Sequence, residues 1–200
     1  MEDWNKKNYG LEKLLNQVLD VPGDIVELGV YKGATIKLLR DYLIKTGKNY
    51  YGFDTFTGYT TEDLADVTNN NIEGLIRNTK QKAWVINPNI VYTLIQDLNL
   101  MSRCKIYEGD LKIEFKKAIE RKEISSIAAL IVDCNAYLPA LVGMGLAKNH
   151  MHKNSLIIID EHVTGGETSA LFKFAMLNNY FVYPTGYKYP DGPSKYIRIK

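Results

Sequence analysis

Acidic side chains stand at the ends of five apolar segments, and their chemistry makes them the first candidates for a functional site. These carboxylates are Glu27, Asp54, Asp110, Asp133 and Asp160. Ligands of open α/β sheets bind beyond the carboxyl ends of the strands. If the five segments are neighbouring parallel strands, we expect the carboxylates to share one rim, where they can bind cations and hydroxyl groups.

The stretch GDIVELGVYKGATIKLL, residues 23–39, reads as a strand, a glycine turn and a helix. Glu27, Gly29 and Gly33 form the pattern E-x-G-x-x-x-G. Gly29 permits a tight turn and close backbone approach, and Gly33 lets the helix pack near the strand. The turn has neither G-x-G-x-x-G nor a Lys-Ser/Thr pair, which disfavours a diphosphate. An acid at Glu27 would repel phosphate but suits an ammonium group.

The same rim fits a nucleoside that carries a positive charge and an amino group, which describes S-adenosylmethionine. Asp54 follows the glycine turn by the interval at which an acid accepts ribose hydroxyls. We expect adenine at the turn of Gly109 and Asp110, and the Tyr31 ring over the methionine portion. The alternative is that each acid simply caps the helix that follows it.

A second group of acids comes from the fourth and fifth apolar segments, which should be neighbours. Asp133, Asp160 and Glu161 would repel one another without a cation, and Mg²⁺ prefers such oxygen ligands. The ion could hold two substrate oxygens and activate a hydroxyl, which makes Asp133 both a cofactor-side and a catalytic candidate. His162 is a candidate general base. The alternatives are a helix cap or a lysine partner for these acids, and a solvent-facing loop for His162.

Apolar strand-like segments alternate with helical spacing along the chain, which predicts an α/β fold with a doubly wound, mostly parallel sheet. We expect strands at 24–29, 49–54, 104–108, 127–133, 154–160, 180–184 and 195–200, and helices at 9–19, 34–46, 91–101, 111–121, 138–150 and 167–179. A final hairpin should add one antiparallel edge strand. The polar stretch 57–89 reads as an insertion or lid with a helical piece near 72–84, within one domain of residues 1–200.

Composition narrows the class of protein. The 200 residues are 46% apolar and carry a formal net charge of +2, which gives no reason to expect nucleic acid or an anionic membrane as partner. The two cysteines, Cys104 and Cys134, read as buried free thiols in a reducing compartment. The chain shows no signal-peptide pattern and no run of 18 apolar residues. We therefore expect a cytoplasmic protein.

Five segments, in order, resemble the macrocin O-methyltransferase family. They are GDIVELGVYKGATIKLL, YGFDTFTG, EGD, ALIVDCNAY and LIIIDEHVTGGETSA, within about residues 20–180. The resemblance implies a class I S-adenosylmethionine-dependent fold with seven strands, the last antiparallel. It also implies a magnesium-dependent sugar O-methyltransferase that uses Asp133, Asp160 and Glu161. The family usually has a second acid where this chain has Asn135, and often Asp-Asp where this chain has Asp160-Glu161.

Two other functions stay open at this level. One is a methyltransferase that acts without metal through a side-chain base. The other is a nucleoside-binding homologue without turnover, which Asn135 and the short N-terminal segment would suit. The acceptor is expected to be a small molecule, a free or nucleotide-linked sugar or another hydroxylated compound. Relatives often form oligomers, so a homo-oligomer is an open alternative.

Overall fold

A computed structural model describes residues 4–60, 84–160, 166–187 and 192–200, and it confirms the predicted α/β fold. Seven strands form one sheet, in the order β3-β2-β1-β4-β5-β7-β6. The strands are β1 (Asp24–Leu28), β2 (Tyr50–Asp54), β3 (Cys104–Glu108), β4 (Ile127–Val132), β5 (Met151–Ile159), β6 (Val182–Pro184) and β7 (Lys195–Arg198). The helices are α1 (Trp4–Leu15), the short 3₁₀ turn η1 (Asn16–Val18), α2 (Ala34–Thr46), α4 (Asn89–Asp97), α5 (Leu111–Glu120), α6 (Tyr137–Lys148) and α7 (Gly166–Asn178).

The five strands β1 to β5 run parallel, and β7 runs antiparallel to both of its neighbours, β5 and β6. The antiparallel last strand is therefore confirmed, but its predicted place at the edge is wrong. β7 inserts between β5 and β6, where Ile197 pairs with Ile157 on one side and Val182 on the other. Ile197 is fully buried, and the short strand β6 forms the edge instead.

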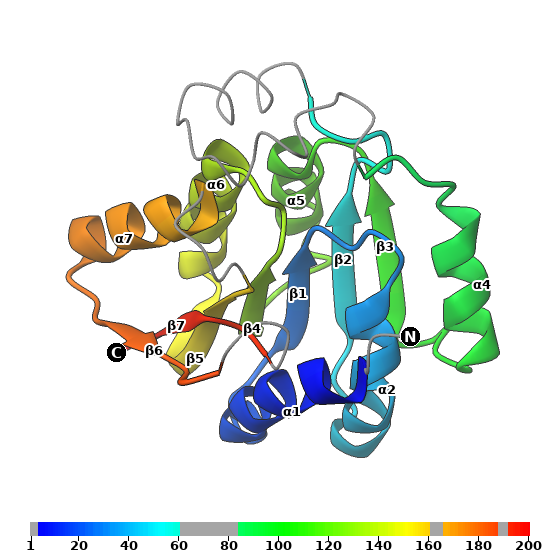
Figure 1. The fold of residues 1–200 in the computed structure, drawn as a ribbon, viewed down its shortest axis with the longest axis horizontal. Coiled ribbons are helices and arrows are strands. Elements are labelled where there is room, and N and C mark those ends of the chain that lie inside the picture. The colour runs from blue at the N-terminus through cyan, green and yellow to red at the C-terminus, as the bar shows by residue number, and fades with distance from the viewer. Residues whose placement is uncertain (1–3, 61–83, 161–165, 188–191) are drawn as a thin grey trace.

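Helices cover both faces of the sheet, so each face has its own apolar core (Figure 1). On one face α5, α6 and α7 pack through side chains such as Phe115, Met144 and Phe174. On the other face α1, α2 and α4 pack through side chains such as Leu15, Leu39 and Ile95. All six residues of β4 are buried, as expected for a central parallel strand covered on both sides.

Most element boundaries follow the sequence pattern closely, but three elements differ. Helix α1 was predicted at 9–19 and spans Trp4–Leu15, and strand β5 was predicted at 154–160 and spans Met151–Ile159. The third is α4. The pattern predicted this helix at 91–101, but it begins at Asn89 and ends at Asp97. The helix ends early because Asn99 takes a left-handed backbone conformation, with φ of 57°, which a continuing helix excludes.

The two ends of the predicted insertion at 57–89 are paired with each other. Thr57 forms an antiparallel bridge with Val85, and the Ile86 amide donates a hydrogen bond of 3.0 Å to the Phe56 carbonyl. Residues 61–83, and with them nearly all of the predicted helical piece at 72–84, lie outside the described residues. The lid and the single domain therefore stay predictions.

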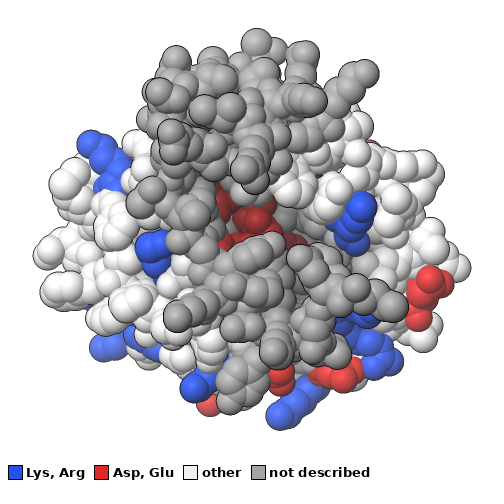
Figure 2. All heavy atoms as spheres, in the orientation of Figure 1, with Lys and Arg blue, Asp and Glu red and all other residues white. Residues whose placement is uncertain are grey.

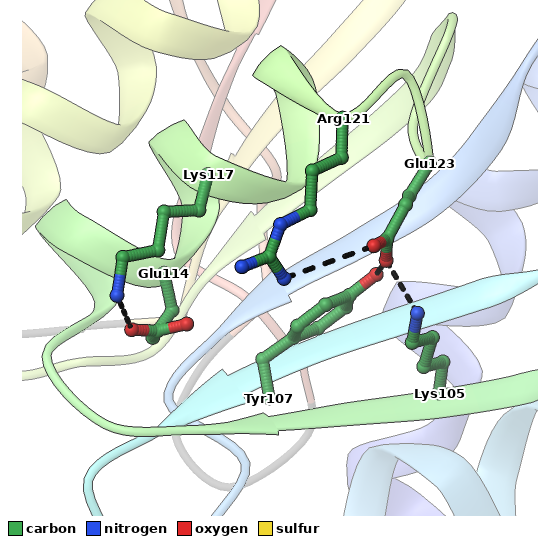
Figure 3. Close-up of polar contacts among 6 residues, drawn as sticks. All are labelled: Lys105, Tyr107, Glu114, Lys117, Arg121 and Glu123. Carbon is green, nitrogen blue, oxygen red and sulfur yellow. Dashed lines mark hydrogen bonds and ion pairs between the residues drawn. The ribbon is translucent and has the colours of Figure 1, made fainter.

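An ionic cluster holds α5 to strand β3 (Figure 3). Lys105 and the Tyr107 hydroxyl both donate to the Glu123 carboxylate, and Arg121 lies 3.9 Å from it. The hydrogen bond from Lys105, followed by that from Tyr107, holds the pKa of Glu123 below its ordinary value. The cluster ties the chain that follows α5 to strand β3, and none of its residues is a candidate site residue.

Candidate active site at the carboxyl ends of the strands

Five neighbouring strands end at the same level, and a ladder of backbone hydrogen bonds fixes this arrangement. In each case the backbone amide of the residue just beyond one strand donates to the carbonyl of the last or next-to-last residue of the neighbouring strand. The bonds are Gly109 to Asp54 (2.9 Å), Gly29 to Phe53 (2.9 Å), Asp133 to Leu28 (2.8 Å) and Asp160 to Val132 (3.2 Å). The strand ends therefore form one common rim. Figure 2, in the orientation of Figure 1, shows acidic residues gathered near the centre of the view.

The turn after β1 is built on close contact between two backbones. Gly29 has φ of +94°, and a Cβ atom there would lie 2.0 Å from the carbonyl oxygen of Asp133. Only glycine fits this position, so the turn can pass directly over the end of β4. At Gly33, with φ of +76°, a Cβ atom would meet Leu94 of α4 at 2.9 Å. The close neighbour of Gly33 is thus a helix, and not the strand that the sequence pattern suggested.

The Asp54 carboxylate shapes the glycine turn. Its Oδ2 accepts hydrogen bonds from the backbone amides of Val30 (2.8 Å) and Tyr31 (2.7 Å), and its Oδ1 accepts from Phe56 (2.7 Å). A carboxylate offers about four lone-pair sites, and three are occupied here. The predicted contact with ribose hydroxyls therefore has one remaining site on this side chain, and the main effect of Asp54 is to orient the turn.

Glu27 lies beneath the same turn and is 1% exposed. The Tyr50 hydroxyl donates a hydrogen bond to its Oε2 atom. Burial raises the pKa of Glu27 to about 8, hydrogen bonds from Thr35 and Tyr50 oppose the rise, and Asp160 and Asp54 add to it. The carboxyl is therefore largely protonated at neutral pH until a cation comes close to it.

The turn after β3 holds the two residues predicted to contact adenine. Gly109 joins the hydrogen-bond ladder, and Asp110 caps α5 by accepting from the Lys112 amide at 2.9 Å. The Lys112 ammonium also lies 3.3 Å from Asp110. Asp110 thus has the capping role that the sequence left open, and its contact with adenine stays a prediction.

Three aromatic side chains stand at this rim, and only Tyr31 was found from the sequence. The Tyr31 and Trp84 rings meet edge to face, with centroids 5.1 Å apart and planes at 89°. Tyr59 follows β2, and its hydroxyl is buried. Tyr59 and Trp84 stand at the two ends of the polar stretch, which is the signal that could have drawn attention to them.

The predicted metal ligands are only partly visible. Asp133 and Asp160 are brought together by the last hydrogen bond of the ladder, between neighbouring strands β4 and β5. Glu161 and His162 lie outside the described residues. Within the described part of the chain, no three His, Cys, Asp or Glu side chains form a group that could hold a metal. The magnesium site as a whole therefore stays a prediction.

Glu167 is a candidate that the sequence pattern missed. It lies in the first turn of α7, is fully buried, and accepts a hydrogen bond from the Asn135 amide through Oε1. Asn135, three residues after the last residue of β4, Val132, has a left-handed backbone with φ of 55°. A buried carboxylate is costly unless it is hydrogen-bonded, so this contact marks the loop as a tightly built part of the site.

The sheet order, the single antiparallel strand β7 and the glycine turn after β1 define a class I S-adenosylmethionine-dependent methyltransferase. The profile of the family described as Macrocin-O-methyltransferase (TylF) matches residues 6–179, and the chain belongs to this family. No curated protein sequence matches the chain. Within its described residues, no helix combines the length and apolar character needed to cross a membrane.

Solved structures of other methyltransferases share this fold. CalS11, a calicheamicin methyltransferase, is 22% identical, with a TM-score of 0.78 over 96% of this chain and 77% of its own. The O-methyltransferase NovP is 18% identical, with a TM-score of 0.76 over 98% of this chain and 80% of its own. Fibrillarin from Aeropyrum pernix, solved with natively bound S-adenosyl-L-methionine, is 13% identical, with a TM-score of 0.55 over 97% and 75%.

Proposed function

We propose that this methyltransferase transfers a methyl group from S-adenosylmethionine to a hydroxyl group of a sugar, either free or nucleotide-linked. The observation that supports the proposal best is the common level at which β3, β2, β1, β4 and β5 end. It gathers the glycine turn and the acidic rim in one place. The family name points to a sugar-bearing acceptor, and one solved CalS11 structure is described as a TDP-rhamnose 3'-O-methyltransferase.

The residues of the glycine turn and of the rim contact different parts of the cofactor. The open backbone from Gly29 to Gly33 receives the amino acid end, and Glu27 beneath it attracts the ammonium group. The remaining acceptor site on Asp54 binds a ribose hydroxyl, and the turn of Gly109 and Asp110 borders adenine. When bound, S-adenosylmethionine supplies an electrophilic methyl group on a positively charged sulfur.

The acceptor side of the proposal uses Asp133, Asp160 and Glu161 as ligands of Mg²⁺, which supplies charge that lowers the pKa of the acceptor hydroxyl. Asp133 or His162 takes the proton that this hydroxyl loses. Holding two reactants in the right geometry can lower a barrier by about 7–11 kcal/mol, so much of the acceleration would come from positioning. The cytoplasmic location and the homo-oligomer also stay predictions.

The test is a methyl-transfer assay with a panel of free sugars and nucleotide-linked sugars that includes TDP-rhamnose. We expect a product that has gained one methyl group on oxygen, lost on addition of a chelator and restored by Mg²⁺. Asp160→Ala should bind cofactor normally and lose the metal-stimulated turnover. Turnover that ignores the chelator would indicate a side-chain base without metal. Cofactor binding without transfer to any acceptor would indicate a non-catalytic homologue.

A further inference from the structure

Three aromatic residues from separate segments stand together along the cofactor side of the rim. They are Tyr31 in the glycine turn, Tyr59 after β2, and Trp84 near the end of the polar stretch 57–89, and we call them the aromatic wall. Tyr31 and Trp84 are in direct edge-to-face contact at 5.1 Å. Trp84 is 38% exposed, so part of its indole ring is open to a ligand.

The backbone holds the wall in place at both ends. The Tyr31 amide donates to Asp54, and the residue has a left-handed backbone with φ of 48°. Trp84 directly precedes the bridge between Val85 and Thr57, so it is fixed beside the exit of β2.

Tyr59 is the third residue of the wall and follows the exit of β2. Burial raises the pKa of Tyr59 above its ordinary value. A hydrogen bond with Trp84 opposes the rise, and the negative charges of Cys134, Glu167 and Asp133 add to it. The Tyr59 hydroxyl is buried. The wall therefore borders the glycine turn, where the methionine portion is expected.

The chemistry of this surface suits a cation. The faces of aromatic rings attract positive charge, tryptophan most strongly, and the neighbouring carboxylates act in the same direction. Tyr31 already has the Lys32 ammonium 5.1 Å from its ring centroid, so Trp84 is the ring of the wall that we expect to meet the cation of a ligand. S-adenosylmethionine carries a sulfonium cation, whereas its demethylated product S-adenosylhomocysteine carries a neutral thioether.

We propose that the aromatic wall, and Trp84 above all, binds the sulfonium group and so distinguishes the methyl donor from the demethylated product. The inference rests on the proposed function only in taking S-adenosylmethionine as the ligand. It adds a specificity role for a residue outside the glycine turn and the acidic rim. Loss of the charge on methyl transfer would weaken this contact and favour release of the product.

The test compares the dissociation constants of S-adenosylmethionine and S-adenosylhomocysteine by calorimetry. Trp84→Leu keeps an apolar side chain without a ring, and Trp84→Phe keeps a smaller ring. We expect the preference for S-adenosylmethionine over the thioether to fall by about 3- to 30-fold in Trp84→Leu and by less in Trp84→Phe. An analogue with an ammonium group in place of the sulfonium should weaken in parallel with S-adenosylmethionine.

The control is Phe181→Leu, because Phe181 is an exposed aromatic residue next to the edge strand β6. This variant should keep the wild-type preference. Tyr31→Leu provides a second variant of the wall should Trp84→Leu fail to fold, as judged by circular dichroism. An unchanged preference in a folded wall variant would overturn the inference. Failure of the wild-type protein to bind either ligand would instead contradict the proposed function.

Discussion

The hydroxyl of Tyr50 donates a hydrogen bond to the buried carboxylate of Glu27, and both side chains lie in the core beneath the cofactor turn. The two residues come from adjacent strands, β1 and β2. An acid whose pKa is raised to about 8 is stable there mainly in its neutral form. The protein therefore places an ionisable group, at some cost in stability, directly under the turn where we expect a cationic ligand.

Glu27 should make the fold less stable as the pH rises. Its pKa is about 8 in the folded protein, against 4.5 when unperturbed, so the folded state binds more protons between these values. Stability then falls across this window, by a total on the order of 5 kcal/mol. We expect Glu27→Gln to be more stable than wild type at pH 8, with a much smaller difference at pH 5. Urea denaturation at both pH values measures this, and parallel pH profiles of the two proteins would contradict it.

The same acid should link cofactor binding to proton release. An ammonium group near Glu27 favours the ionised carboxylate, so its pKa falls on binding. We expect the affinity for S-adenosylhomocysteine, which keeps the ammonium group, to rise between about pH 6 and pH 8, with a proton released to the buffer. Calorimetry in two buffers of different ionisation enthalpy counts this proton. Glu27→Gln should release none at this site, and an unchanged count in the variant would assign the proton to another group.

Substitutions of Asp54 should weaken cofactor binding in a graded way. Asp54→Asn keeps one oxygen for the Val30 and Tyr31 amides but turns an N–H group toward Phe56, whereas Asp54→Ala removes all three acceptors. A buried amide without an acceptor costs about 1–3 kcal/mol. We expect an affinity for S-adenosylhomocysteine in the order wild type, Asn, Ala, with at least about a 10-fold loss for Ala. Wild-type affinity in Asp54→Ala would count against the assigned site.

The sequence carried enough information for the sheet and for the rim of acids. Apolar segments such as 127–133 identify a central strand, and parallel strands place their ends at one edge. Trp84 and Glu167 could not be found this way because each acts through a contact with a distant segment. Trp84 meets Tyr31 across the rim, and Glu167 meets Asn135 across 32 residues of chain. The place of β7 inside the sheet was missed because its short apolar pattern does not say whether the strand pairs on one side or on two. In the structure it pairs with both β5 and β6.

Glu167 should stabilise the loop after β4 through its hydrogen bond to Asn135. Glu167→Ala leaves the Asn135 amide without this acceptor, and we expect a loss of about 1–3 kcal/mol in the free energy of unfolding. Glu167→Gln keeps an oxygen at the same distance along the side chain and should lose less. Urea denaturation measures the stability, and amide hydrogen exchange at Asn135 reports the local contact. Equal losses in both variants would show that the carboxylate charge matters instead.

The central claim is that the strand ends around Gly29, Asp54 and Asp133 form the binding site for S-adenosylmethionine. Titration of the wild-type protein with S-adenosylhomocysteine by calorimetry, with and without Mg²⁺, tests it most directly because no acceptor is needed. We predict saturable binding at one site per chain, displaced by S-adenosylmethionine and reduced in Asp54→Ala. Absence of saturable binding by a folded protein would contradict the account.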